Sequence, residues 1–330
     1  MVVAVSGNEI IAFEPKKVVI IGLGYVGLPL LSSISKFFEC SGYDISLRRI
    51  NEIKSEIDIT NELDKFDLKR ISKLELVHGE NNLPLGDTYI VTVPTPIDSY
   101  NVPDLNPLKS ACEIISRNLK KGDLVIFEST VYPGCTEEYC KPILEKLSDL
   151  KEGSDFYIGY SPERINPGDS TKPIESITKI VSGSNQHALE RVIGVYSKII
   201  EAGLHKTSSI KIAETAKVIE NIQRDINIGL MNELSMIFNK IGLDTKDVLK
   251  AAASKWNFSY YEPGLVGGHC IGVDPYYMSY LSKKIGIKNS NMILAGRNTN
   301  ESMKDFIINN LFKPIKSRKI KLSNSKILIL

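Results

Sequence analysis

The first half of the chain alternates short apolar runs with amphipathic segments, a pattern typical of βαβ units. The runs predicted to be strands are Lys17–Ile21, Cys40–Asp44, Tyr89–Val93, Leu124–Phe127 and Phe156–Tyr160. Helices are predicted at Val26–Phe38, Leu108–Leu119 and Gly134–Leu147. Strands that alternate with helices build a parallel sheet with helices on both faces. We therefore predict a Rossmann-type, doubly wound α/β domain over residues 1–209.

The pattern changes after Ser209. Residues 210–241 contain no proline, and Gly229 is the one internal break in a long helical pattern. A second such pattern runs from Met292 to Lys316, with Pro314 near its end. Helices of this length usually form the spine of a helical domain or a subunit interface. We predict an all-helical domain over residues 210–312 that pairs two chains into a homodimer.

The end of the chain is predicted to be a linker and a strand. A polar stretch from Lys316 to Ser325 leads into the apolar run Lys326–Leu330. A strand needs partners at its edges, and none follows in the sequence. We interpret residues 313–330 as the linker and first strand of a truncated C-terminal α/β domain, with apolar side chains partly exposed.

The clearest motif of the first half is Gly22-Leu23-Gly24-Tyr25-Val26-Gly27, which follows the first strand and opens the first helix. In such a motif Gly22 makes the turn, Gly24 lets a pyrophosphate approach the backbone, and Gly27 permits close packing. Asp44 ends the next strand, about 20 residues on, where a carboxylate binds ribose hydroxyls and repels a 2′-phosphate. The motif predicts NAD as the cofactor.

The clearest motif of the second half is a glycine-rich loop, Pro263–Tyr277, that carries Cys270. Glycines before His269 let the backbone approach a ligand closely. A thiol at the end of such a loop has neighbours that can stabilise the thiolate, which is the form that attacks carbon. A nicotinamide site with a nucleophilic cysteine indicates a dehydrogenase that takes an alcohol past the aldehyde to the acid.

Polar residues also follow the predicted strands and line one face of the long helix. Val93–Pro96, Glu128–Thr130 and Ser161–Gly168 each follow a strand, where ligands of open α/β sheets bind. Lys217, Asn221 and Arg224 are four and three residues apart and share a helix face. Taken alone, these segments fit plain turns and a solvated helix surface as well as they fit a site.

Composition excludes several classes of protein. The net charge is +2, from 41 basic and 39 acidic side chains. This balance gives no excess of positive charge of the kind that binds nucleic acid or an anionic membrane. No segment has the ~20 apolar residues of a membrane span. Five scattered cysteines without a secretory signal indicate a reduced, cytoplasmic protein. Cys135 and Cys140 have no further ligands near them in the sequence, so no metal site is predicted.

In their order and spacing these motifs resemble the UDP-glucose/GDP-mannose dehydrogenase family over nearly the whole chain. The matching segments are Gly22–Pro29, Val93–Pro96, Glu128–Thr130, Ser161–Gly168, Glu214–Glu233 and Pro263–Tyr277. The Gly-Gly-His-Cys sequence and the segment Ser254–Phe258 resemble the branch that oxidises UDP-N-acetylhexosamines for surface polysaccharides. The mannosamine enzymes of that branch typically differ at Lys255–Asn257.

The resemblance implies a four-electron oxidation at C6 of the sugar by two molecules of NAD. Cys270 would hold the aldehyde as a thiohemiacetal and then as a thioester. Lys217 and Asn221 would hold the C6 oxygen, and Asp274 a water or a proton. The residues implied to be catalytic are Cys270, Lys217, Asn221, Asp274, Glu163 as the base for the hydrolytic water, and Thr130, which positions that water.

The resemblance also implies the residues that bind the two ligands. Those expected to line the NAD site are Gly22, Gly24, Tyr25, Val26, Gly27, Asp44, Arg49, Thr95 and Thr130. Those expected to bind the UDP-sugar are Arg164, Ile165, Lys217, Asn221, Arg224, Lys255, Asn257, Gly264 and His269.

Three alternative functions stay open. A two-electron dehydrogenase of the hydroxyacid type also joins a nucleotide domain to a long-helix domain, but it has no use for the cysteine loop. A UDP-glucose 6-dehydrogenase would share most motifs. A dimeric NAD-binding fragment without turnover would share the first motif. The epimer of the hexosamine is not determined by these patterns.

Overall fold

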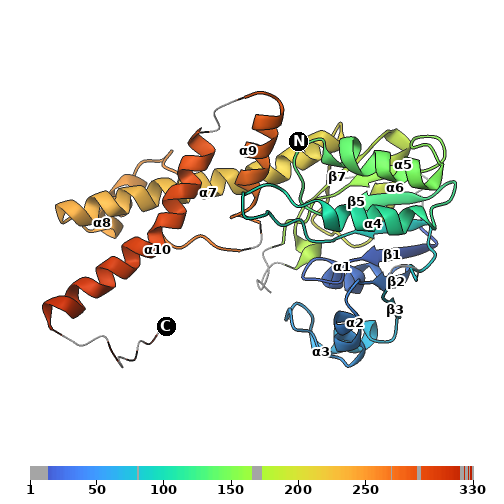
Figure 1. Cartoon of the computed structure of the whole chain (residues 1–330), viewed down its shortest axis with the longest axis horizontal. Helices are drawn as coiled ribbons and strands as arrows, with labels where there is room; N and C mark the ends of the chain where they lie inside the picture. The colour runs from blue at the N-terminus through green and yellow to red at the C-terminus, as the bar shows by residue number, and fades with distance from the viewer. Residues whose placement is uncertain are drawn as a thin grey trace. The chain divides into compact units, whose positions relative to one another are not determined.

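The computed structural model describes residues 14–79, 82–165, 173–268, 270–287, 291–319, 323, 326 and 328. The chain divides into two compact units, residues 1–218 and 219–330 (Figure 1). The division falls inside one continuous helix, α7 (Ile210–Ile241). The domain boundary was predicted after residue 209, at the start of this helix, whereas the two units divide after Val218, inside the helix.

Eight strands of the described residues form one sheet in the first unit, in the order β3-β2-β1-β4-β5-β6-β7-β8. Strands β1 to β6 pair in parallel, β7 is antiparallel to β6, and β8 is parallel to β7. The bounds are β1 (Lys17–Ile21), β2 (Glu39–Tyr43), β3 (Glu75–Val77), β4 (Thr88–Val91), β5 (Leu124–Phe127), β6 (Tyr157–Tyr160), β7 (Lys179–Gly183) and β8 (Leu204–Lys206).

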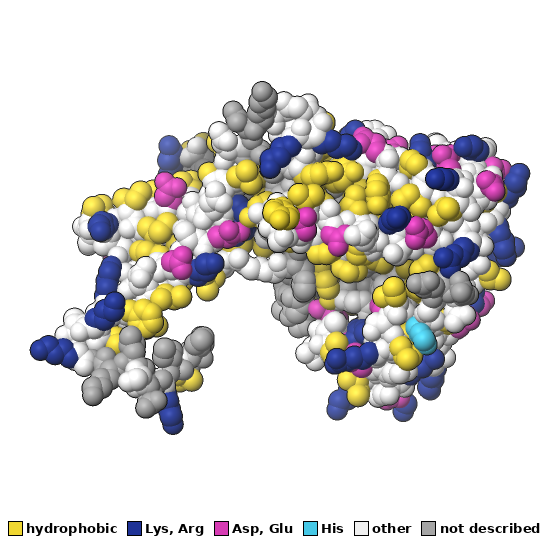
Figure 2. All heavy atoms as spheres, viewed as in Figure 1, with side chains coloured by type: hydrophobic (Ala, Val, Ile, Leu, Met, Phe, Trp, Pro, Cys, Tyr) yellow, Lys and Arg dark blue, Asp and Glu magenta, His cyan; other side chains and the backbone are white. Residues whose placement is uncertain are grey.

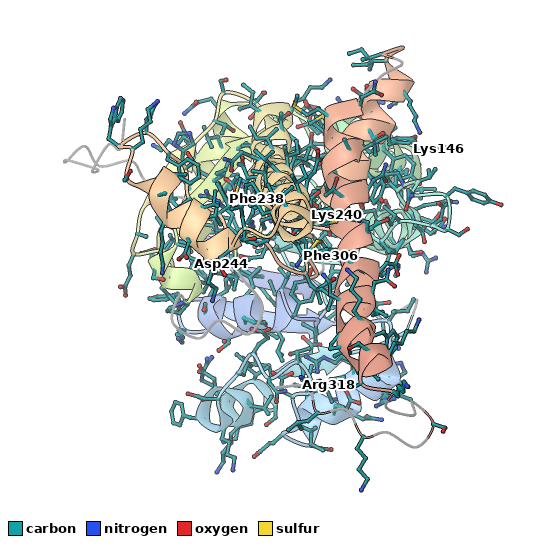
Figure 3. All side chains as sticks on the ribbon, turned by 90° about the vertical axis from the view of Figure 1, so that its left-hand side faces the viewer. Lys146, Phe238, Lys240, Asp244, Phe306 and Arg318 are labelled. Carbon is teal, nitrogen blue, oxygen red and sulfur yellow. The ribbon has the colours of Figure 1, made fainter. Side chains whose placement is uncertain are left out.

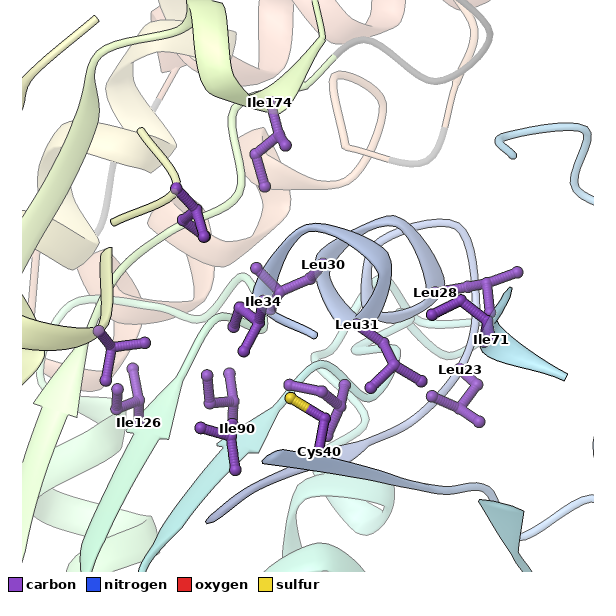
Figure 4. Close-up of a cluster of buried hydrophobic side chains, with 14 of the residues drawn as sticks. Leu23, Leu28, Leu30, Leu31, Ile34, Cys40, Ile71, Ile90, Ile126 and Ile174 are labelled. Atoms are coloured by element: carbon purple, nitrogen blue, oxygen red, sulfur yellow. The ribbon is translucent and has the colours of Figure 1, made fainter. Parts of the chain in front are cut away.

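Helices connect these strands and cover the sheet. They are α1 (Gly27–Ile34), α2 (Leu47–Lys54), α3 (Lys65–Ile71), α4 (Asn106–Ser116), the π-helix η1 (Thr136–Cys140), α5 (Lys141–Ser148), the 3₁₀-helix η2 (Ile174–Ser176) and α6 (Gln186–Tyr196). Leu30 and Ile34 of α1 pack against Ile90 and Ile126 of the sheet (Figure 4). The neighbouring residues along each strand are equally buried and point to the opposite face, where α4 contacts β4. The predicted doubly wound α/β architecture is confirmed.

The sheet departs from the prediction at one end, where β7 runs antiparallel. The sequence pattern also missed β3, β7, β8 and the helices α2, α3 and α6. Strand β8 has three residues and is mostly exposed, and α2 contains five polar residues among its eight. Elements this short or polar carry little hydrophobic periodicity, so tertiary contacts decide them.

The second unit contains the rest of α7 with α8 (Thr245–Ala253), α9 (Asp274–Lys284) and α10 (Asn291–Ser317). The two predicted long helices are therefore present. Gly229 is the point where α7 meets α10, because a side chain there would lie 3.0 Å from the Cα of Gly296. The apparent break in the helical pattern thus permits close approach of two backbones.

A cavity of about 490 Å³ lies between α7 and α10, near Lys240 and Phe306 (Figure 3).

Helix α10 continues through Pro314 to Ser317, past the start of the predicted linker. The strand predicted at 326–330 lies mostly outside the described residues. Of that segment the structure describes Lys326 and Leu328, which adopt no regular structure, and Leu328 is 80% exposed. Within the described chain, no helix combines the length and hydropathy that crossing a membrane requires.

Candidate active site

The glycine loop after β1 lets a ligand approach its backbone closely. Gly22 has φ +94°, a region that favours glycine, and a side chain at Gly27 would lie 1.8 Å from the carbonyl oxygen of Gly22. Gly24 is exposed, with open space where a side chain would stand. The start of α1 therefore offers bare backbone to an anion, the arrangement that binds pyrophosphate in nucleotide sites.

Asp44 and Arg49 bind the two backbone polar groups of one residue of this loop, Leu23. The N–H of Leu23 donates to Asp44 Oδ2 at 2.8 Å, and Arg49 Nε donates to the Leu23 carbonyl at 2.7 Å. Arg49 is buried and also pairs with Asp58 at 3.1 Å. Asp44 is half-buried, so its carboxylate keeps lone pairs for ribose hydroxyls. Arg49 supports the loop, and its direct contact with NAD stays a prediction.

The loops after β4 and β5 meet, as neighbouring parallel strands require. Thr95 Oγ1 donates to the Thr130 carbonyl at 2.6 Å, and Ser129 Oγ donates to the Val93 carbonyl at 2.7 Å. The structure thus brings together two segments that the sequence placed separately at strand ends. Thr130 itself is half-buried at this edge.

Glu163 follows β6 and is buried, 9% exposed. Its Oε1 accepts from the backbone N–H groups of Arg164 at 2.5 Å and Ile165 at 2.6 Å. Its Oε2 lies 3.7 Å from Lys179 Nζ. The Arg164 guanidinium donates to the Thr178 carbonyl at 2.7 Å, and the Ile165 side chain packs against the hydrophobic core. A ligand contact by Ile165 would therefore use its backbone.

The first turns of α7 are tied to the π-helix. Glu214 accepts from the N–H groups of Gly134 at 2.5 Å and Thr136 at 2.9 Å. Burial raises the pKa of Glu214 to about 7, while these hydrogen bonds oppose the shift. The contact fixes the part of α7 that lies one turn before Lys217.

Lys217 is 6% exposed, and no hydrogen bond or ion pair joins its side chain to any residue in the described part of the chain. A buried cation is costly unless an anion or other acceptor stands beside it. Asn221 follows one turn later on the same helix, as the predicted stripe requires. That these two side chains hold an oxygen of the ligand stays a prediction.

Asn221 and Asp274 form a buried pair in the second unit. Asn221 Nδ2 donates to Asp274 Oδ2 at 2.5 Å, and Arg224 donates to Asn221 Oδ1 at 2.5 Å. Asp274 is the first residue of α9 and is fully buried. The structure therefore brings together three residues that the sequence placed in one site; their catalytic and binding roles stay predictions.

Cys270 lies just before α9. Its carbonyl accepts from the N–H groups of Val273 and Asp274, both at 2.9 Å, in the turn that starts the helix. The thiol is half-buried, and none of the five cysteines forms a disulfide. The backbone on its N-terminal side includes Gly268 at φ +120°. His269, predicted to contact the substrate, lies outside the described residues.

The cysteine loop is anchored at Gly264 by Asn232 of α7. Asn232 accepts from the Gly264 N–H at 2.7 Å and donates to its carbonyl at 3.0 Å. Asn232 also donates to Asn300 at 2.7 Å, which continues to a buried pair between Asp225 and Arg297. Sequence reasoning missed this network, because its members lie within helices whose apolar pattern hides single polar residues.

Two models of one protein family match most of the chain. The NAD binding domain of the UDP-glucose/GDP-mannose dehydrogenase family matches residues 16–200, and the central domain of that family matches residues 211–302. The chain belongs to this family. The predicted resemblance is confirmed, and the first unit contains the NAD-binding domain of a nucleotide-sugar dehydrogenase.

Individual relatives agree with the family models. The chain is 52% identical over 314 residues to the UDP-N-acetyl-D-glucosamine 6-dehydrogenase of Pseudomonas aeruginosa, covering 95% of this chain and 74% of that protein. It is 49% identical to the enzyme of the same name from Salmonella typhi, with the same coverage. The structure of a UDP-D-ManNAc dehydrogenase from Pyrococcus horikoshii superimposes with a TM-score of 0.83 at 32% identity, covering 92% of this chain and 73% of that one.

The described residues fit the NAD that the family binds. Bare backbone at Gly24 and the start of α1 suits the pyrophosphate, and the half-buried Asp44 suits a ribose. Tyr25 and Val26 are half-buried beside them, and Thr95 and Thr130 stand at the neighbouring strand ends. Lys255 and Asn257 are exposed between α8 and α9, so their predicted substrate contacts stay proposals.

Proposed function

We propose that this protein is an NAD-dependent UDP-N-acetylhexosamine 6-dehydrogenase that supplies hexosaminuronates for surface polysaccharide. The observation that carries the proposal is the Asn221–Asp274 pair: Asn221 lies on the helix that also carries Lys217, and Asp274 begins the helix that follows the Cys270 turn. The name and 52% identity of the Pseudomonas relative support the sugar class. A cytoplasmic location fits the substrate and belongs to the same proposal.

The first oxidation needs the C6 hydroxyl to lose a proton and a hydride. Lys217 and Asn221 would bind the C6 oxygen, because the buried ammonium and the amide stabilise the negative charge that develops there. Asp274 orients the Asn221 amide through its 2.5 Å hydrogen bond and would accept or relay the proton. NAD, bound at the glycine loop, supplies the oxidising power by accepting a hydride in each of the two oxidations.

The second oxidation needs a covalent intermediate. The Cys270 thiolate would add to the aldehyde carbon and form a thiohemiacetal, from which the next hydride leaves. The product is a thioester between Cys270 and C6. Water would then attack that carbon while Glu163 takes a proton from the water, and the C–S bond would break to return the thiolate. Thr130 would help to position this water.

A count of NADH tests the proposal. With UDP-GlcNAc, UDP-GalNAc or UDP-ManNAc we expect two NADH for each uronate formed, and a strong preference for NAD over NADP because Asp44 repels a 2′-phosphate. UDP-glucose is the matched substrate without the acetamido group. One NADH per sugar would favour a two-electron dehydrogenase, and NAD binding without any NADH would favour the non-catalytic alternative.

The helical unit would also pair two chains. Ile219, Leu230, Ile237 and Ile241 form an apolar stripe on one face of α7, each about half-exposed. Figure 2 shows hydrophobic side chains exposed along this unit. Their spacing of 11, 7 and 4 residues keeps them on one side of a helix. A stripe of this kind needs a partner, and we propose that a second copy of the chain provides it.

Sedimentation of two variants tests the homodimer. We expect the wild type to sediment as a dimer and Ile237→Glu as a monomer, because a carboxylate in an apolar helix interface is left unpaired. Asn239→Glu, nearly on the opposite side of the same helix turn, is the matched control and should stay dimeric. A monomeric wild type would exclude the α7 interface.

A further inference from the structure

A cluster of buried charged and hydroxyl side chains lies behind Glu163 in the first unit. Lys179 is the first residue of β7, and its Nζ lies 3.0 Å from Glu128 Oε2 and 3.7 Å from Glu163 Oε2. Glu128 follows β5 and accepts a hydrogen bond from the Tyr196 hydroxyl at the end of α6. The Lys179 ammonium also lies 5.0 Å from the Tyr196 ring centre. Four elements of the fold thus meet at one cation.

The charges in this cluster do not balance. The ammonium of Lys179 lies beside two carboxylates, those of Glu128 and Glu163, and all three groups are buried. Burial alone would lower the pKa of Lys179, but Glu128 and Glu163 raise it above its ordinary value, so the amine stays charged. Burial raises the pKa of Glu128, and the neighbouring ammonium opposes that shift. Removing Lys179 alone would leave two buried carboxylates without a counter-charge.

Glu163 has one oxygen engaged and one available. Oε1 holds two backbone N–H donors, whereas Oε2 is buried without a hydrogen-bond donor among the described residues. The ammonium at 3.7 Å is beyond hydrogen-bonding distance and attracts this oxygen through charge. Oε2 is therefore the carboxylate oxygen whose acceptor position no described residue uses.

We propose that Lys179 is a positioning residue for hydrolysis of the thioester: held by Glu128 and Tyr196, it keeps the Glu163 carboxylate in the place from which it takes a proton from the attacking water. The inference rests on the proposed function, since it needs Glu163 to activate that water. In this step the water oxygen bonds to C6 and one water proton passes to Glu163. The C–S bond then breaks, and its electron pair stays on Cys270 as thiolate.

The test removes Lys179 while keeping the net charge of the cluster. In Lys179→Met/Glu128→Gln the only remaining carboxylate of the cluster is Glu163, without a cation beside it. Positioned general bases contribute about 10²–10⁴-fold, and we expect kcat to fall at least ~10-fold with KM nearly unchanged. The first NADH should appear at the wild-type rate. The covalent Cys270 adduct should then accumulate and be detected by mass spectrometry of the quenched enzyme.

Two further variants keep the inference open to refutation. Tyr196→Phe removes only the hydroxyl that holds Glu128 and should give a smaller change in the same direction. Lys17→Met is the matched control, because Lys17 also begins a strand and pairs with two glutamates, Glu39 and Glu75, but stands outside the cluster. Hydrolysis in the double variant equal to this control, or slowing of the first hydride transfer instead, would overturn the role of Lys179.

Failure of the proposed function would look different. The wild type would then make no uronate from any of the UDP-sugars. A crystal structure of the double variant would decide the positioning claim in that case. A Glu163 carboxylate that turns away from its present site supports the claim, and one that stays in place overturns it.

Discussion

Replacing Cys270 with serine is expected to stop the formation of uronic acid while the affinity for NAD stays near the wild-type value. A serine hydroxyl is almost entirely protonated at neutral pH and is a poor nucleophile without an adjacent base. Cys270 belongs to the loop before α9, whereas the glycine loop that would bind NAD follows β1. Uronate formation measured with saturating NAD, together with an NAD titration, checks both parts.

Cys40→Ala is the matched control for that experiment. Cys40 is buried in β2, and burial raises its pKa to about 12, so this thiol stays protonated at neutral pH and cannot serve as the nucleophile. The control is expected to retain turnover. Full steady-state activity in Cys270→Ser would refute covalent catalysis by this residue.

The second large effect is expected at Lys217. We expect Lys217→Ala to lower kcat at least ~100-fold, because loss of one oxyanion donor costs about 10²–10³-fold in enzymes. Lys217 is 6% exposed and has no protein partner among the described residues, so its charge is available to a ligand. The measurement is kcat with the preferred UDP-sugar.

Lys211→Ala is the control for Lys217 on the same helix. Lys211 is exposed and pairs with Glu138 at 3.2 Å, and exposed pairs contribute little. Its loss should leave kcat within about twofold of the wild type, far from the oxyanion-donor range. A change of less than about threefold in Lys217→Ala would return Lys217 to the role of a packed structural residue.

Tertiary contacts decided features that local patterns hide. Strand β7 has the sequence KIVSG, and its two consecutive apolar residues are too short a run to predict a strand. The antiparallel pairing of β6 with β7 depends on register across the sheet, which no local pattern contains. Asn232 is a similar case. One polar residue inside a helix does not reveal that its side chain binds both the N–H and the carbonyl of Gly264.

The sequence by itself determined the doubly wound nucleotide domain, the long helices and the family. Each depends on a local rule: alternating apolar runs, a glycine turn after a strand, and an uninterrupted helical period. Only the tertiary structure showed that Asp44 and Arg49 both bind the backbone of Leu23. The same holds for the hydrogen bond between Asn221 and Asp274 and for the two carboxylates beside Lys179. These contacts join residues far apart in the chain, and their strength depends on burial, which removes the competing water.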